Sequence, residues 1–309
     1  MLYPINDTPQ GTLSASKPAV SLMPPDRSQI MTLIAAPGAE AELRATVAEL
    51  GRPADWLGPA ACDLIGDEPE EAVARAAIGG RPIDLIRQPA PGRRKRLLVA
   101  DFESTIIENE MLEELAEFLG LRAHVAEITR RAMNGEIDFV GALTERVALL
   151  RGLPVLALDE AASHIRLMPG ARALIATLRG AGVHTALVSG GFTVFAEPIA
   201  KALGFYRVVA NRLAIADGKL AGTLEPPIVT GATKRDTLIA LAAEYRLTLD
   251  ETMAVGDGAN DLPMLQSAGL GVAFRAKPAV AAASRARLDN ADLTGLLYAQ
   301  GYRLAEIVE

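Results

Sequence analysis

From residue 97 onward, short apolar runs alternate with longer segments, and this alternation predicts the architecture of most of the chain. Each short run is typical of a buried strand, and each longer segment carries apolar residues at helical spacing. The expected strands cover residues 97–100, 185–188, 206–210, 213–215, 252–255 and 270–274. The expected helices cover residues 171–179, 192–203, 234–245, 260–268, 278–284 and 293–300. Strands that alternate with helices form parallel sheets, so we expect an α/β fold with a doubly wound parallel sheet.

The segment between the strand at 97–100 and Pro169 shows only helical spacing. Its apolar positions, from Ile107 to Val147, fall on the inner faces of successive helices, and no strand pattern interrupts them. A length of about sixty residues is too great for a simple crossover between neighbouring strands. The sequence therefore predicts an inserted helical cap at about residues 107–168, folded over the end of the sheet.

The part of the chain before this region is organised differently. Residues 1–28 combine several prolines with polar residues, which predicts an extended or disordered tail. The next segment predicts a strand at 30–34, a helix at 40–50, a strand within 56–65, a helix at 68–78 and a strand at 82–86. This β-α-β-α-β order over about sixty residues indicates a small α+β accessory module without the glycine fingerprint of a dinucleotide fold.

Residues 89–96 follow the module and combine prolines and a glycine with a run of four basic residues. We interpret this stretch as a solvated linker rather than a binding patch. The expected division of the chain is a tail at 1–28, a module at 29–90, and a core with its cap at 91–309.

Composition and charge narrow the classes of function. The 309 residues carry a net charge of -7 and a pI of about 5.2, which argues against nucleic acid or an anionic membrane as the main partner. Cys62 is the single cysteine, so an intrachain disulfide framework is excluded. The chain shows neither a signal-peptide pattern nor an apolar run of about eighteen residues, and we expect a cytoplasmic protein.

Three of the expected strands end in residues that carry chemistry. The residues after these strands are Asp101 and Glu103, then Ser189 with two glycines, then Asp257 and Asp261. Around the first strand alone, an acid and a serine before a helix are equally typical of a helix cap. If the strands are parallel, however, their carboxyl ends meet on one rim. Because clustered carboxylates repel one another, a hard cation such as Mg²⁺ is expected there.

Lys234 adds a positive charge to this picture. It opens the helix expected at 234–245, where the helix dipole disfavours a cation. A solvated lysine is the simple interpretation. Beside the three strand ends, we favour a point charge that is aimed at a phosphoryl group on the same rim.

These groups, in this order along the chain, resemble the haloacid dehalogenase superfamily of phosphohydrolases and, within it, the phosphoserine phosphatases. The matching segments are 101–105 with Glu110, 132–146, 188–192, 210–213, Lys234 and 255–261. The resemblance covers the chain from about residue 96 to its end. Residues 29–88 resemble the small amino-terminal modules of longer members.

The resemblance implies a role for each group on the rim. Asp101 would be the nucleophile and would form an aspartyl-phosphate. Mg²⁺ would be held by the Asp101 carboxylate, the Glu103 carbonyl and Asp257, with Asp261 in support. The equatorial phosphoryl oxygens would be held by Ser189, the Gly190 amide and Lys234, with Asn260 beside them.

The resemblance also implies roles for the cap. Glu110 and Arg146 would bind the ammonium and carboxylate of a seryl substrate, and Met133 and Phe139 would close the cap over the pocket. From spacing alone, we would interpret Glu110 and Arg146 as solvated helix charges, and Met133 and Phe139 as residues of helix packing.

Glu103 departs from the family pattern, which has Asp two residues after the nucleophile. This residue would protonate the leaving serine oxygen and then deprotonate the attacking water. Glu keeps the carboxylate, but a misplacement of roughly 1 Å can cost on the order of a hundredfold in rate. We expect the backbone to accommodate Glu103 as the acid and base.

The expected function is Mg²⁺-dependent hydrolysis of O-phospho-L-serine to L-serine and phosphate, the last step of serine biosynthesis. One alternative is a phosphatase or phosphotransferase for another small phosphate ester. A second alternative is a regulatory protein that senses serine through residues 29–88 and retains weakened catalysis. The sequence leaves a homodimer open.

Overall fold

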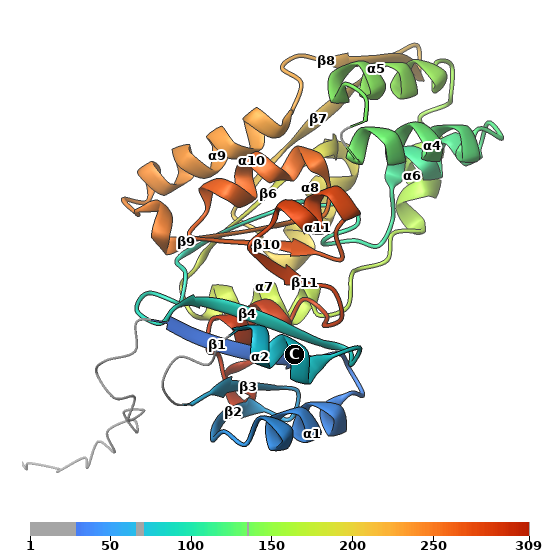
Figure 1. Cartoon of the computed structure of the whole chain (residues 1–309). Helices are drawn as coiled ribbons and strands as arrows, with labels where there is room; N and C mark the ends of the chain where they lie inside the picture. Colours follow the sequence, from blue (N-terminus) through green and yellow to red (C-terminus); the bar gives the residue numbers. More distant parts are fainter. Residues whose placement is uncertain (1–28, 66–70, 135, 309) are drawn as a thin grey trace, which may run out of the picture.

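The computed structural model describes residues 29–65, 71–134 and 136–308. In Figure 1 a small N-terminal module lies at one end of the main sheet, and the helices α4, α5 and α6 of the cap lie at the opposite end. The predicted tail at 1–28 lies outside the described residues. The predicted division of the chain into a tail, a module and a core stays a prediction.

The main sheet contains seven strands in the order β11-β10-β9-β5-β6-β7-β8. They are β5 (Leu97–Ala100), β6 (His184–Phe192), β7 (Arg207–Ala216), β8 (Lys219–Glu225), β9 (Thr252–Gly256), β10 (Leu270–Phe274) and β11 (Ala286–Leu288). All neighbours pair in parallel except β7 and β8, which form an antiparallel hairpin. The predicted doubly wound parallel sheet is confirmed, with one antiparallel strand added at its edge.

Helices cover both faces of this sheet. They are α7 (Ala171–Gly180), α8 (Thr193–Leu203), α9 (Gly231–Glu244), α10 (Leu262–Ser267), α11 (Pro278–Ala283) and α12 (Gly295–Ala299). Successive residues of β5 face opposite sides, because side chains alternate along a strand. Leu98 belongs to the buried cluster that contains α7 and α8, whereas Val99 belongs to the cluster that contains α9 and α10. β5 is thus buried on both faces, as its continuous apolar run predicts.

Three sequence-based boundaries in this sheet are wrong. β6 continues through Ser189 and the two glycines instead of ending before them. The two short strands expected around Asn211 form one strand, β7, because the buried Asn211 amide is hydrogen bonded to Gly190 and Val229 and does not interrupt pairing. The three-residue strand β11 was missed.

The predicted insertion of helices after the first core strand is confirmed. It contains α3 (Met111–Glu117), α4 (Arg122–Met133), α5 (Phe139–Leu149) and α6 (Leu156–Ser163). The first helix begins at Met111 rather than at Ile107, because Ile107 forms an isolated antiparallel bridge with Leu167. This bridge brings the two ends of the insertion together beside the sheet.

The N-terminal module forms its own antiparallel sheet in the order β2-β3-β1-β4. Its elements are β1 (Gln29–Ala35), α1 (Glu40–Leu50), β2 (Ala54–Gly58), β3 (Ala61–Leu64), α2 (Glu71–Ile78) and β4 (Ile83–Pro89). The predicted order lacked one strand, since the segment at 56–65 contains part of a two-stranded hairpin. The predicted start of the second helix, at residue 68, lies outside the described residues.

The expectation of a solvated basic linker is wrong. Arg93 forms an ion pair with Asp63 of the module at 2.7 Å, and both side chains are mostly buried. Lys95 is 7% exposed and donates from its ammonium to two backbone carbonyl oxygens, those of Gly92 and Asp250. The basic run therefore joins the module to the core instead of separating them.

Among the described residues, no helix has the length and apolar character that crossing a membrane requires. The cytoplasmic location stays a prediction.

Candidate active site

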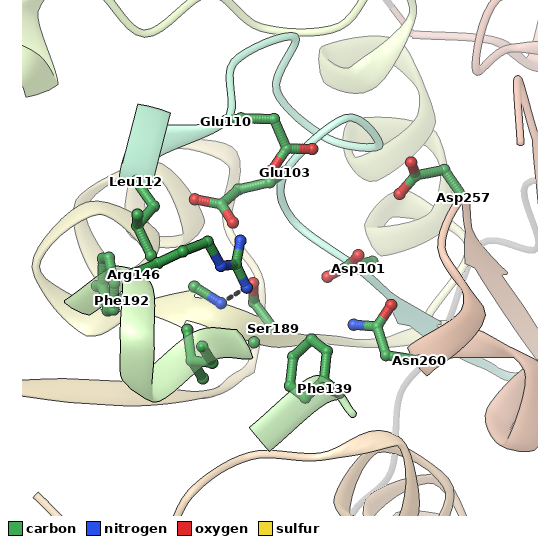
Figure 2. A pocket seen from close by; sticks show the side chains of 13 residues that line it. Asp101, Glu103, Glu110, Leu112, Phe139, Arg146, Ser189, Phe192, Asp257 and Asn260 are labelled. Atoms are coloured by element: carbon green, nitrogen blue, oxygen red, sulfur yellow. Dashed lines mark hydrogen bonds between the residues drawn. The ribbon is translucent and has the colours of Figure 1, made fainter. Parts of the chain in front are cut away.

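The carboxyl ends of the central strands meet at one pocket, which the cap covers (Figure 2). The pocket encloses about 470 Å³, part of which is open to solvent. Predicted site residues that line it are Asp101, Glu103, Glu110, Phe139, Arg146, Ser189, Gly190, Asp257 and Asn260. Leu112, Leu143, Gly191 and Phe192 complete the lining. Of the remaining predicted residues, Lys234 and Asp261 lie buried beside Asp101, and the side chain of Met133 is outside the described structure.

Asp101 is held at the end of β5 by its neighbours. Its backbone N–H donates to the carbonyl of Val255 on β9, which continues the sheet pairing by one residue. The ammonium of Lys234 lies 2.7 Å from Asp101 Oδ1 and 2.7 Å from Asp261 Oδ1. Burial raises the pKa of Asp101 well above its ordinary value, and the charge of Asp261 adds to this, while Lys234 opposes it.

Lys234 lies in the first turn of α9 with no exposed surface, so the interpretation as a solvated lysine is wrong. Burial lowers the pKa of Lys234, but Asp101 and Asp261 outweigh burial and raise it overall. The lysine is therefore a charged group that pairs with two carboxylates on the rim, one of which lines the pocket.

Asp261 uses both of its carboxylate oxygens within the protein. Oδ1 pairs with Lys234, and Oδ2 accepts the backbone N–H groups of Asp257 and Gly258. Its role is therefore to fix the loop after β9, which agrees with the supporting role that the resemblance implies.

Ligand atoms from Asp101, Asp257 and Asp261 lie within 4.8 Å of one another, and all three residues are buried. Asp101 Oδ2 and Asp257 Oδ1 make no hydrogen bond or ion pair to another described residue. These two unpaired carboxylate oxygens lie beside the hydrogen-bonded carboxylate of Asp261, and such a set of oxygens suits a hard cation such as Mg²⁺. The donor set of the rim therefore fits the predicted metal.

Lys277 is a charged residue of the rim that the sequence analysis missed. It follows β10, and its ammonium pairs with Asp257 Oδ2 at 2.8 Å. Burial raises the pKa of Asp257 to about 6, with Lys277 opposing the shift and Glu110 and Asp261 reinforcing it. The signal that could have revealed Lys277 is its position just after a fourth strand whose end meets the same rim.

Glu103 is accommodated by a hydrogen bond to the cap. Its Oε1 accepts the backbone N–H of Met111, at the start of α3, at 3.0 Å. A Cβ atom on Gly191 would lie 2.9 Å from the Glu103 carboxyl carbon, so the absent side chain leaves room for the longer residue. Burial raises the pKa of Glu103 well above its ordinary value, and the neighbouring Glu110 adds to this. A carboxyl group with a raised pKa is suited to donate a proton near neutral pH.

The end of β6 at Ser189 lies beside Glu103 in the pocket lining. The Ser189 hydroxyl oxygen accepts the backbone N–H of Gly191 at 2.9 Å, and the Gly190 carbonyl accepts from the Asn211 amide at 2.7 Å. A Cβ atom on Gly190 would lie 2.8 Å from the Phe139 ring, so glycine permits the cap to approach this end of the strand closely. Asn211 was part of a matching segment, but its positioning role was not predicted.

Arg146 and Glu110 reach the pocket from the cap. Arg146 is 4% exposed, so the interpretation as a solvated helix charge is wrong for it. Its guanidinium donates to the Ala142 carbonyl and the Thr129 hydroxyl, and it forms no ion pair with a carboxylate of the described residues. Glu110 accepts from the Ser104 hydroxyl at 2.6 Å. The pocket therefore presents one positive and one negative group from the cap beside the acidic rim (Figure 2).

Comparisons with known proteins agree with this arrangement. The family model described as haloacid dehalogenase-like hydrolase matches residues 98–266. The phosphoserine phosphatase of Lactococcus lactis is 47% identical over 203 residues, which cover 66% of this chain and 94% of that protein. The phosphoserine phosphatase SerB2 of Mycobacterium tuberculosis is 45% identical over 215 residues, or 70% of this chain. The match covers 53% of the mycobacterial protein, so this chain spans about half of that longer relative.

A solved structure supports the same assignment. A phosphoserine phosphatase, described as an analogue of its phospho-aspartyl intermediate, superposes with a TM-score of 0.64 and 37% identity. The superposition covers 66% of this chain and 98% of that structure. This chain therefore belongs to the haloacid dehalogenase-like hydrolases, among relatives that are phosphoserine phosphatases.

Proposed function

We propose that this protein hydrolyses O-phospho-L-serine to L-serine and phosphate with Mg²⁺, as the last step of serine biosynthesis. The observation that carries the proposal is the set of groups that one pocket brings together. Asp101 and Ser189 suit a phosphoryl group, while the buried Arg146 and the half-buried Glu110 suit a carboxylate and an ammonium.

In the first step, an oxygen of Asp101 forms a bond to phosphorus, and the bond between phosphorus and the serine oxygen breaks. Glu103 lines the same pocket and gives its proton to the departing serine oxygen. The raised pKa of Glu103 favours the protonated acid that this step requires. The relative described as a phospho-aspartyl intermediate analogue supports the aspartyl-phosphate product of this step.

In the second step, a water oxygen forms a bond to phosphorus, and the bond between phosphorus and Asp101 breaks. Glu103, now ionised, takes the proton of that water, which restores both carboxyl groups. The cap excludes other water through Phe139, whose ring packs against Gly190 beside the phosphoryl site.

Asp101, Asp257 and the Glu103 carbonyl would hold Mg²⁺, and Asp261 would fix their loop. When bound, Mg²⁺ supplies positive charge that offsets the phosphoryl charge in the transition state. Ser189, the Gly190 amide and Lys234 complete the positive surroundings. Asn260 lines the same pocket, and its buried Oδ1 has no partner among the described residues.

The test is phosphate release from O-phospho-L-serine, measured with Mg²⁺, with EDTA, and with the Asp101→Asn variant. We expect metal-dependent release that falls at least about ten-thousandfold in the variant, because the nucleophile is lost. No release by the folded, metal-loaded protein would overturn the proposal and direct attention to other small phosphate esters. The serine-sensing alternative predicts tight serine binding with negligible turnover. The same assay distinguishes it from the proposed function through the rate of phosphate release.

A further inference from the structure

Lys277 is tied to Asp257 by two hydrogen bonds. The backbone N–H of Lys277 donates to the Asp257 carbonyl at 3.0 Å, and the Lys277 ammonium donates to Asp257 Oδ2 at 2.8 Å. One residue thus fixes both the main chain and the side chain of another. The Asp257 side chain is 6% exposed, so its carboxylate is held inside the rim rather than in solvent.

The backbone that carries Lys277 is held in place at both ends. Arg275, two residues earlier, has a φ of +43°, and this left-handed conformation turns the chain back toward the rim after β10. Its N–H donates to the Leu288 carbonyl, and its guanidinium donates to the Ala291 carbonyl. Pro278 then opens α11, where its fixed φ suits the first helical turn.

The two lysines of the rim divide its three aspartates between them. Lys234 is fully buried and pairs with Asp101 and Asp261, whereas Lys277 is partly exposed and pairs with Asp257 alone. Both oxygens of Asp261 accept hydrogen bonds, whereas among the described residues Asp257 Oδ1 has no partner and Lys277 pairs with Oδ2. In Figure 2 the Asp257 carboxylate points into the pocket.

We propose that Lys277 is a positioning residue for the metal site, holding one oxygen of Asp257 so that the other is presented to Mg²⁺. The inference rests on the proposed Mg²⁺ dependence of the enzyme. Groups that hold a metal-ligating carboxylate in place typically raise metal affinity by ten- to a hundredfold. Lys277 also carries a positive charge close to the metal site, and charge alone would weaken the binding of Mg²⁺.

Positioning of Asp257 would raise the affinity for Mg²⁺, whereas the positive charge would lower it. Removal of the lysine therefore shows which effect is larger. The experiment is calorimetric titration of Mg²⁺, without substrate, into the full chain and its Lys277→Met and Lys277→Arg variants. If Lys277 positions Asp257, Lys277→Met weakens Mg²⁺ binding about tenfold, and Lys277→Arg, which keeps a donor, recovers part of the loss. Lys201→Met, which removes an exposed lysine on α8, is the matched control and leaves the affinity unchanged.

Kinetics supply a second readout. The Mg²⁺ concentration for half-maximal phosphate release should rise about tenfold in Lys277→Met, while kcat at saturating Mg²⁺ and KM for O-phospho-L-serine stay within about twofold. Unchanged or tighter Mg²⁺ binding by Lys277→Met would overturn the inference and leave the proposed function intact. If the wild-type chain binds no Mg²⁺, the metal site and this inference fail together. If Lys277→Met does not fold, the Mg²⁺ affinity of Lys277→Arg decides. Wild-type affinity or a moderate loss would support the inference, and tighter binding would contradict it.

Discussion

The core contacts two other parts of the chain, the N-terminal module and the cap, and the two junctions differ. At the module, charged and polar groups form hydrogen bonds across the junction. Beneath the cap, the charged groups of the core largely face a pocket. At the module, the Asp84 carboxylate accepts the backbone N–H groups of Asp289, Asn290 and Ala291. Gln88 also crosses the junction, and its amide donates to the Ala299 carbonyl. Because Asp84 and the Gln88 amide have their partners across the junction, these contacts contribute to stability.

The junction with the cap has a different character. Within the described part of the chain, Glu103 accepts one hydrogen bond, from the first residue of α3, and Arg146 forms no ion pair with a carboxylate. Groups that are buried but incompletely paired are costly unless a ligand completes them. From this difference we expect substitutions under the cap to change turnover. Substitutions at the junction with the module should instead change the free energy of unfolding.

Among the substitutions that test this comparison, the largest effect is expected for Glu103→Gln, which keeps the shape of the side chain but cannot exchange a proton. We expect kcat for O-phospho-L-serine to fall about a thousandfold, with thermal unfolding little changed. Steady-state phosphate release and circular dichroism measure the two quantities. A strong rise in turnover for Glu103→Asp, together with no change for Glu103→Gln, would show that Glu103 is not the acid and base.

The matching substitution at the module is Asp84→Ala. It leaves the N–H groups of Asn290 and Ala291, among others, without their acceptor, so the free energy of unfolding should fall by about 3 kcal/mol. Urea titration followed by circular dichroism measures this loss, and kcat should stay within about twofold. Asp159→Ala, which removes an exposed carboxylate on α6, is the control and should change neither quantity. A large loss of kcat in a stable Asp84→Ala protein would contradict the comparison.

Arg146→Met sharpens the comparison within the pocket. Loss of a charged hydrogen-bond donor to the substrate carboxylate costs about 2–3 kcal/mol, or roughly a hundredfold in kcat/KM for O-phospho-L-serine. A phosphate ester without a carboxylate, such as p-nitrophenyl phosphate, should lose far less. An equal loss with both esters would indicate that Arg146 supports the fold rather than substrate recognition.

The smallest effect concerns pH. The pKa of Asp257 is raised to about 6, so below that pH the carboxyl holds a proton that Mg²⁺ must displace. The Kd for Mg²⁺ should therefore rise as the pH falls through 6, by at least about tenfold for each pH unit once Asp257 is protonated. Calorimetric titrations between pH 5 and 7.5, with the fold checked by circular dichroism, measure this slope. An affinity independent of pH over this range would show that Asp257 is not a ligand.

The parts of the fold and site that could be predicted are those encoded by neighbouring residues. The apolar run of β5 ends directly at Asp101, and that of β9 ends shortly before Asp257, so both acids could be placed on one rim from strand patterns alone. The end of α1 at Leu50 could also be predicted, because Gly51 adopts the left-handed conformation that closes a helix.

The parts that could not be predicted depend on partners far away in the chain. The role of Lys234 toward a phosphoryl group stays a prediction, but its ion pairs with Asp101 and Asp261 depend on contacts that only the assembled sheet creates. The same limit applies to the basic run after the module. Arg93 pairs with Asp63 thirty residues earlier, and local composition gives no sign of that partner.

The binding of this basic run also has a consequence for proteolysis. A stretch of four consecutive basic residues would be an obvious target for trypsin if it were extended and free. Here the Lys95 N–H donates to the Gln300 side chain, the Arg96 N–H donates to the Glu251 carbonyl, and the Arg96 carbonyl accepts from His184. A protease must pull a segment out of such bonds before it can cleave, so limited digestion of the native protein should leave the module attached to the core.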